Sequence, residues 1–367
     1  MIKNFLLLGV TLFIAFSAST QVYSNKPVGK NKIETDTISK YKYLLPIWGE
    51  KVHAKGFDLP YSAGLGVNYL WQESGLIINE LNVGFNNNEP YDLDDIIQFN
   101  DATARSQGVN FRPDIWVLPF LNVYGILATS KTSTDVNFGV YVPTGDDFTE
   151  VFNASTKAEF KGTTFGVGIT PTIGVAGGFL AIDMNYTWTD IAELDKASQI
   201  FVIGPRIGKS FNFKTPERAV SIWAGGFRVG MKSETSGNLA ISSLFDTSEL
   251  GGNIDNGYVK LDESQAKLDS WWNSLTPRQQ ERRQGAYDKG NEAIQKASAL
   301  LSEMDQAVTR VGESTVQYSL EKRQEHTWNL VLGSQFQFNK HWMIRAEAGF
   351  LGSRTQVIAG LQYRFGL

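Results

Sequence analysis

Apolar and polar residues alternate along most of the chain from residue 61 onward. In the last segment, residues 356–367, every second residue is apolar, and Gln, Gly or Arg stand between most of them. Comparable alternation runs through segments that begin near residues 61, 76, 135, 163, 179, 199, 219, 327 and 342. A period of two residues predicts a β-strand with different surroundings on its two faces. The chain is therefore expected to form one large antiparallel sheet.

One segment, residues 114–128, departs from the alternation because it is apolar on both faces. Its register cannot be taken from the pattern alone. One of the two registers would turn Trp116, Phe120 and Tyr124 inward, as an aromatic wall within an otherwise polar interior.

Three features indicate that the apolar faces meet lipid and the polar faces meet an enclosed, wet interior. The polar positions hold Gly, Asn, Thr, Gln and Arg, whereas the outer face of a soluble sheet is normally rich in Lys and Glu. Aromatic residues stand near strand ends on the apolar face, as interface girdles do (Trp71, Trp188, Trp328, Trp342, Tyr363, Phe365). The segments are also about ten residues long, enough to cross a bilayer at a tilt.

A closed barrel is the sheet that leaves no unpaired edge in lipid. The predicted fold is therefore all-β: a transmembrane antiparallel up-and-down β-barrel of about 12 strands. Eleven strands are visible in the pattern. Short links at residues 73–75, 130–133, 176–178, 214–217 and 339–341 alternate with longer ones, which places the carboxy terminus in the periplasm. Since bacterial barrels favour even numbers, a twelfth strand is expected within residues 43–57; the alternative is a plug that threads the lumen.

Composition narrows the class further. The 367 residues include no cysteine, which excludes disulfides, thiolate metal sites and a lipoprotein anchor. The net charge of −4 gives no sign of a nucleic-acid partner. Lys3 and the apolar stretch of residues 5–16, followed by small residues, read as a secretory signal, with an uncleaved anchor helix as the alternative.

The closing strand resembles the carboxy-terminal assembly signal of Gram-negative outer-membrane β-barrel proteins. Val357, Leu361, Tyr363 and Phe365 match its alternating apolar positions, and Leu367 stands where that signal usually has an aromatic residue. The resemblance implies residence in the outer membrane after Sec-type export, with membrane lipid and the barrel-assembly machinery as partners. It implies no particular activity.

Residues 232–325 differ from the rest of the chain. Helical spacing of apolar residues, followed by a helix start at Thr276, Pro277 and Gln279, predicts an α-helical insertion in a long loop. One interpretation is a helical hairpin whose stripes pack together over the barrel mouth. The other is a cap for a partner or ligand, anchored by Trp271 and Trp272.

Charged residues on the predicted polar faces form the best candidate site. The alternation places seven of them in the lumen: Glu80, Asp183, Arg206, Arg228, Arg345, Glu347 and Arg364. They form either a salt-bridged network that fills a narrow lumen or a selective constriction in a pore. An excess of arginine favours anionic solutes.

No cofactor motif, metal-ligand spacing or hydrolase signature is found in the sequence. Ser319, Glu325 and His326 are the one grouping that could act in hydrolysis, and we predict no enzyme activity, catalytic residue, metal or cofactor.

The predicted organisation is a signal peptide at residues 1–24, a periplasmic or plug segment or first strand at 25–60, and a barrel at 61–367. The helical insertion occupies residues 246–313, within an extracellular loop. The leading functional hypothesis is a narrow channel for small polar or anionic solutes. The alternatives are a surface-binding or envelope-structural barrel and, more weakly, an outer-membrane hydrolase.

Overall fold

A computed structural model describes residues 41–55, 57, 59–86, 88–192, 197–232, 234–245, 247–310 and 314–367. The predicted signal peptide lies outside the described residues. None of the helices in these ranges is long and apolar enough to cross a membrane.

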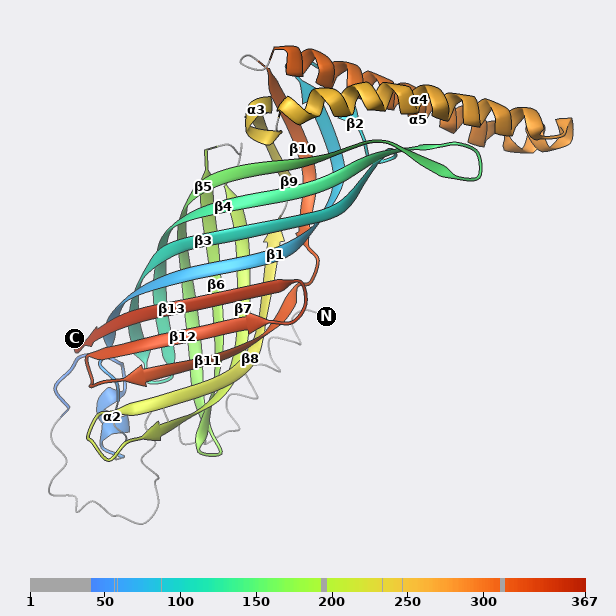
Figure 1. The fold of residues 1–367 in the computed structure, drawn as a ribbon. Helices are drawn as coiled ribbons and strands as arrows, with labels where there is room; N and C mark the ends of the chain where they lie inside the picture. Colours follow the sequence, from blue (N-terminus) through green and yellow to red (C-terminus); the bar gives the residue numbers. More distant parts are fainter. Residues whose placement is uncertain are drawn as a thin grey trace.

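Ten antiparallel strands form a closed barrel (Figure 1). Closure is made by the first and last strands, which pair from Ala63 opposite Phe365 to Ser74 opposite Arg354. The barrel strands are β1 (Ala63–Phe85), β3 (Ile97–Leu118), β4 (Leu121–Pro143), β5 (Phe148–Val175), β6 (Gly178–Ile191), β7 (Ser198–Asn212), β8 (Ala219–Lys232), β11 (Trp328–Gln337), β12 (Trp342–Phe350) and β13 (Arg354–Phe365). The predicted all-β barrel is confirmed.

The predicted number of about 12 strands was wrong, for a local reason. Residues 73–75 and 130–133, expected to be turns, lie inside the continuous strands β1 and β4. The turn that the pattern missed is at residues 119–120, within the segment that is apolar on both faces. The described residues between 43 and 57 contain no strand; they hold the short helix α2 (Gly49–His53). The predicted turns at 176–178, 214–217 and 339–341 do separate strands.

The outer face of the barrel is an apolar belt. Leu65 and Val67 on β1, Ile207 on β7 and Leu332 on β11 expose between 41% and 62% of their surfaces. Aromatic rings border this belt, with Phe165 stacked on Trp188 at one edge and Phe213, Phe336 and Phe338 in edge-to-face contact at the other. A continuous exposed apolar surface of this kind is stable in lipid and not in water.

At one end of the barrel, here called the helical end, the strands continue beyond the belt. β8 leads into β9 (Glu234–Ala240), the helices follow, and β10 (Thr315–Gln324) leads back into β11. β10 pairs with β9 on one side and with residues 76–85 of β1 on the other. The two-residue strand β2 (Tyr91–Asp92) pairs with β1.

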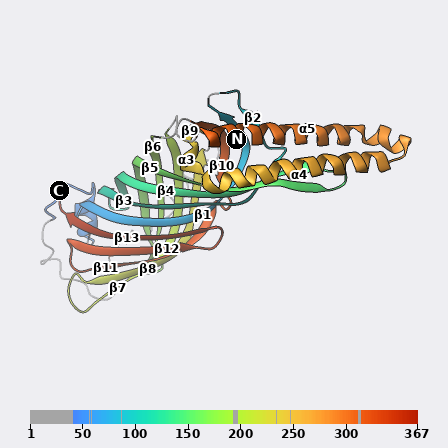
Figure 2. The same ribbon diagram turned by 45° about the horizontal axis from the view of Figure 1, so that its top comes forward.

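The predicted helical insertion consists of α3 (Ile241–Leu244), α4 (Thr247–Ser274) and α5 (Pro277–Thr309). The backbone N–H of Thr276 donates to the Gln279 side chain at 2.9 Å, which forms the expected cap at the start of α5. α4 and α5 lie side by side and extend beyond the barrel along the long β4–β5 hairpin (Figure 2). The helical hairpin of α4 and α5 therefore rests on an extension of the sheet.

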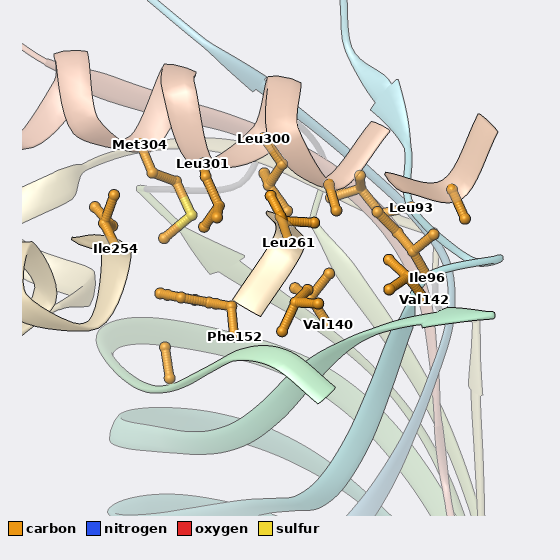
Figure 3. Packing of buried hydrophobic residues seen from close by; sticks show 14 of the residues in the cluster. Leu93, Ile96, Val140, Val142, Phe152, Ile254, Leu261, Leu300, Leu301 and Met304 are labelled. Carbon is orange, nitrogen blue, oxygen red and sulfur yellow. The ribbon is translucent and has the colours of Figure 1, made fainter. Parts of the chain in front are cut away.

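A buried apolar cluster fixes the helices to this extension. Leu300, Leu301 and Met304 of α5 point toward Val140 and Phe152 of the sheet (Figure 3). Leu261 and Leu268 of α4 belong to the same cluster, and Leu268 and Leu301 have no exposed surface. Burial of this apolar area is the main force that holds the hairpin in place.

The first described residues, 41–55 with α2, lie at the opposite end, here called the terminal end, beside the C-terminus (Figure 1). The backbone N–H of Leu44 donates to the carbonyl of Leu367 at 2.8 Å, and that of Ile47 donates to Val117 at 2.9 Å. The segment thus reaches the mouth of the lumen, and its described residues 41–55 do not thread it as a plug.

Candidate functional site

The centre of the lumen is organised around the carboxylate of Glu347 on β12, whose side chain has no exposed surface. Arg206 of β7 donates to it from Nε and Nη2, each at 2.8 Å. The indole Nε1 of Trp223 on β8 donates to the same carboxylate at 2.7 Å, and Arg345 Nη2 donates to it at 3.2 Å. A two-point guanidinium–carboxylate pair of this kind is strong and fixed in direction.

Asp183 on β6 forms the second half of the network. Its carboxylate accepts hydrogen bonds from the Tyr124 hydroxyl and the Thr170 hydroxyl, each at 2.7 Å. The Arg206 guanidinium lies 3.8 Å from Asp183, and that of Arg112 lies 3.9 Å away. Arg112 also stacks over the Tyr124 ring, with 3.6 Å between its guanidinium carbon and the ring centroid. We call the residues of these two halves the lumen network (Arg112, Tyr124, Thr170, Asp183, Arg206, Trp223, Arg345, Glu347).

Two glycines make room for the large rings of the lumen network. A Cβ added at Gly333 would lie 2.3 Å from the Trp223 indole, and one at Gly168 would lie 2.2 Å from the Tyr124 ring. Both distances are far below van der Waals contact. Glycine at these inward positions is therefore required for the rings to lie flat against the wall.

A third pair lies nearer the terminal end. Arg364 Nη2 donates to Asp114 Oδ1 at 2.9 Å, and the Asn122 amide donates to the same oxygen at 2.7 Å. Between this pair and the lumen network is a cavity of about 110 Å³, with Gln335, Gln362 and Pro60 among its lining residues. Charged and amide side chains make up much of its lining.

Toward the helical end of the lumen lies a buried arginine that forms no hydrogen bond within the described part of the chain. Arg354 on β13 is 2% exposed, and none of its three guanidinium nitrogens has a hydrogen-bond partner among the described residues. Its one contact of note is with the ring of Phe227, at 5.7 Å. Both side-chain polar atoms of buried Asn329 and the amide nitrogen of buried Gln356 also lack partners. Buried donors in this state are costly unless they bind water or a ligand.

Five of the seven predicted lumen residues lie inside the barrel: Asp183, Arg206, Arg345, Glu347 and Arg364. The structure brings Asp183, Arg206, Arg345 and Glu347 into one network and places Arg364 in the separate pair with Asp114.

The prediction for Arg228 was wrong. On β8, Ser221, Trp223 and Val229 are buried inside, so Arg228 is exposed on the outer face. The alternation predicted that the aromatic residues of this strand face lipid, but Trp223 fills part of the narrow lumen.

The prediction for Glu80 was also wrong. Glu80 is an exposed residue at a bulge with φ 52°, where its backbone N–H donates to Asp94 at 2.9 Å. Beyond this bulge Leu81 and Phe85 face inward, in a part of the barrel that lies above the apolar belt.

Sequence reasoning missed Arg112, Asp114, Trp223 and Arg354 as lumen residues. Arg112 and Asp114 alternate with apolar neighbours in "VNFRPDIW", a signal that was available but lay at the border of the ambiguous segment. In the ambiguous segment Trp116 and Tyr124 are buried on the inner face, whereas Phe120 lies in the turn.

Trp271 and Trp272 make contacts within the chain. The Trp271 indole donates to Asp146 at 3.3 Å, and Trp272 stacks on Tyr287 of α5 with ring centroids 4.6 Å apart. Arg283 pairs with the same Asp146 carboxylate and, as the larger cause, lowers the pKa of Asp146 below its usual value. These contacts favour the packing interpretation of the hairpin over the docking one.

The hydrolase grouping does not assemble. His326 Nδ1 lies 3.3 Å from Ser353 Oγ, whereas Ser319 lies opposite Asn82 in the β10–β1 ladder. Among the described residues no group of three or more His, Asp or Glu side chains is placed to hold a metal ion.

A closed barrel with an apolar outer belt and an ionised lumen defines the class: the chain is an outer-membrane β-barrel protein. No family model matches the sequence, and no curated protein matches it.

Several solved structures share the barrel architecture. The β domain of the Bordetella autotransporter BrkA is 8% identical and has a TM-score of 0.35, over 83% of this chain and 100% of that one. The translocator domain of the autotransporter NalP from Neisseria meningitidis is 11% identical, with a TM-score of 0.30 over 82% and 88% of the two chains. An outer membrane channel from Pseudomonas putida F1 is 8% identical, with a TM-score of 0.25 over 83% and 96%. Similarity at this level concerns the fold alone.

Proposed function

We propose that this barrel is a narrow channel for small anionic solutes. The observation that carries the proposal is Arg354, a buried guanidinium in the lumen without a carboxylate or hydrogen-bond partner among the described residues. A passing anion would supply the missing acceptor. In a pore, fixed charges and donors of this kind select the sign of the ion.

The charge balance of the lumen supports the same proposal. Five arginines line it between the two edges of the apolar belt (Arg112, Arg206, Arg345, Arg354, Arg364), against three carboxylates (Asp114, Asp183, Glu347). After three carboxylates are matched, an excess of two positive charges remains. The proposed path runs from the helical end past Arg354, through the lumen network, into the polar cavity near Gln335.

The proposal includes an orientation. We place the terminal end in the periplasm and the helical end outside the cell, following Sec-type export and insertion by the barrel-assembly machinery. The alternating closing strand, Arg354–Phe365, and the short turns at the terminal end support this placement.

The test is ion selectivity in planar bilayers under a potassium chloride gradient. We expect the wild-type barrel to pass small ions with a preference for chloride, and Arg354→Gln to lower the chloride-to-potassium permeability ratio several-fold. Arg228→Gln is the matched control, because it removes the same charge from the exposed outer face of β8. An unchanged ratio in Arg354→Gln would exclude Arg354 as the selecting group.

A non-transport barrel, serving as a surface-binding or envelope-structural module, is the second candidate. It is favoured by the lumen network itself, in which Arg206 and Glu347 bind each other from strands on different parts of the wall. Side chains commonly fill the interior of a small barrel. Complete electrical silence of a correctly folded protein would favour this second candidate over the channel.

A further inference from the structure

The lumen changes character above the apolar belt. Beyond Arg354, inward-facing residues become apolar and enclose a second cavity of about 180 Å³. Its walls come from the upper parts of β1, β3, β4, β5 and β10, and the helices α3 and α5 cover it. The lining includes Ile78, Phe99, Phe138, Phe160, Leu320 and Met304. We call this the upper chamber.

One charged residue lines the upper chamber. Lys322 on β10 lies opposite Ile78, near the end of the chamber that adjoins Arg354. Lys322 is half-buried, and no carboxylate among the described residues forms an ion pair with its ammonium. Burial among apolar side chains lowers the pKa of Lys322 below its usual value, because a low-dielectric surrounding disfavours the charged form.

The chamber also has an opening in the barrel wall. Pairing between β1 and β3 ends at Gly75 opposite Thr103, and from Leu76 onward β1 pairs with β10 instead. A third cavity lies in the resulting gap and shares Leu76, Ile78, Ile97 and Phe99 with the upper chamber. A ligand therefore has a side entrance that is apolar on its inner rim.

From this geometry we propose that the upper chamber binds a monocarboxylate with a medium-length alkyl chain, with the chain among the apolar walls and the carboxylate on Lys322. Charge complementarity selects this occupant: an apolar cavity that contains one unpaired ammonium matches a ligand with an apolar body and one anionic head. An apolar cavity of about 150 Å³ accommodates benzene, so the upper chamber holds a chain of about six to eight carbons. This site lies on the helical-end side of Arg354, and the inference does not depend on channel activity.

The experiment measures binding of octanoate and of octanol by calorimetry, with the full chain held in an amphipathic polymer rather than in detergent. We expect wild-type protein to bind octanoate, and Lys322→Met to bind it at least tenfold more weakly while keeping its affinity for octanol. Lys161→Met, an exposed lysine on β5, is the matched control and should behave as wild type.

A second variant tests the walls independently of the charge. Ala158 lines the upper chamber, so Ala158→Phe fills it and should abolish binding of both octanoate and octanol. Correct folding of each variant is checked by its heat-dependent shift in gel migration. The proposal is overturned if wild type fails to bind octanoate, if Lys322→Met binds it as well as wild type, or if Ala158→Phe leaves binding intact. The two proposals can fail independently. Chloride selectivity without octanoate binding would overturn this inference and leave the proposed channel function standing.

Discussion

Glu347→Ala is expected to destabilise the barrel by about 3–5 kcal/mol, the usual effect of removing one partner from a buried ion pair. The variant leaves Arg206 without its two-point acceptor, and it removes the acceptor of Trp223 and Arg345 as well. Asp183, at 3.8 Å, is the one remaining carboxylate near Arg206 among the described residues, and it is already held by Tyr124 and Thr170. The measurement is the free energy of unfolding in urea for protein folded into lipid vesicles.

Two further variants make this result specific. Glu347→Gln keeps a side-chain acceptor for Trp223 while it removes the charge, so we expect a smaller loss. Glu73→Ala breaks the exposed pair with Arg105, whose side chain is 55% exposed, and should cost no more than about 1 kcal/mol. If Glu347→Ala and Glu73→Ala unfold at the same urea concentration, the lumen network does not hold the barrel together.

Leu301→Ala is expected to loosen the helical hairpin from the sheet by about 2–5 kcal/mol, the range for truncation of a buried leucine. Leu301 of α5 has no exposed surface and packs against Gly257 of α4, where an added Cβ would lie 2.8 Å from its side chain. Because the cluster lies outside the membrane belt, the effect should be local. We expect faster amide hydrogen exchange throughout α4 and α5, with the exchange of the barrel strands unchanged.

Val259→Ala provides the control for the hairpin. Val259 lies on α4 and is 58% exposed, so its truncation removes the same kind of apolar group without leaving a cavity. Equal exchange in the Leu301→Ala and Val259→Ala variants would show that the apolar cluster does not dock the helices.

The upper chamber and the part of the lumen that holds the lumen network have different physical surroundings. Between the edges of the belt, the interior must carry its own polar network, since the wall is narrow and lipid surrounds it. Above the belt, α3 and α5 close the barrel from one side, and the interior there is apolar like the core of a soluble domain. Arg354 and Lys322 lie at the transition, and neither forms an ion pair with a carboxylate among the described residues.

The sequence by itself determined the features that depend on neighbouring residues. Period-two alternation on β6, β7, β12 and β13 placed Asp183, Arg206, Glu347 and Arg364 on the inner face, because successive side chains of a strand point to opposite sides. The apolar stripe and the cap at Thr276 located the helical hairpin, because both are properties of a single stretch of chain.

Only the tertiary structure decided what lies across from each face. Alternation divides a strand into two sides, but it does not say which side is inside when both are largely apolar. For this reason Trp223 was predicted to face lipid and Arg228 the lumen, whereas the structure has the reverse. The sequence pattern also could not tell a turn-like stretch inside a long strand from a true turn. Glu73–Gly75 continues β1, whereas Phe120 lies in a turn, and the difference depends on which strands pair beside them. The contact between Arg206 and Glu347 joins residues 141 positions apart, and it exists because barrel closure brings β7 and β12 to one small lumen.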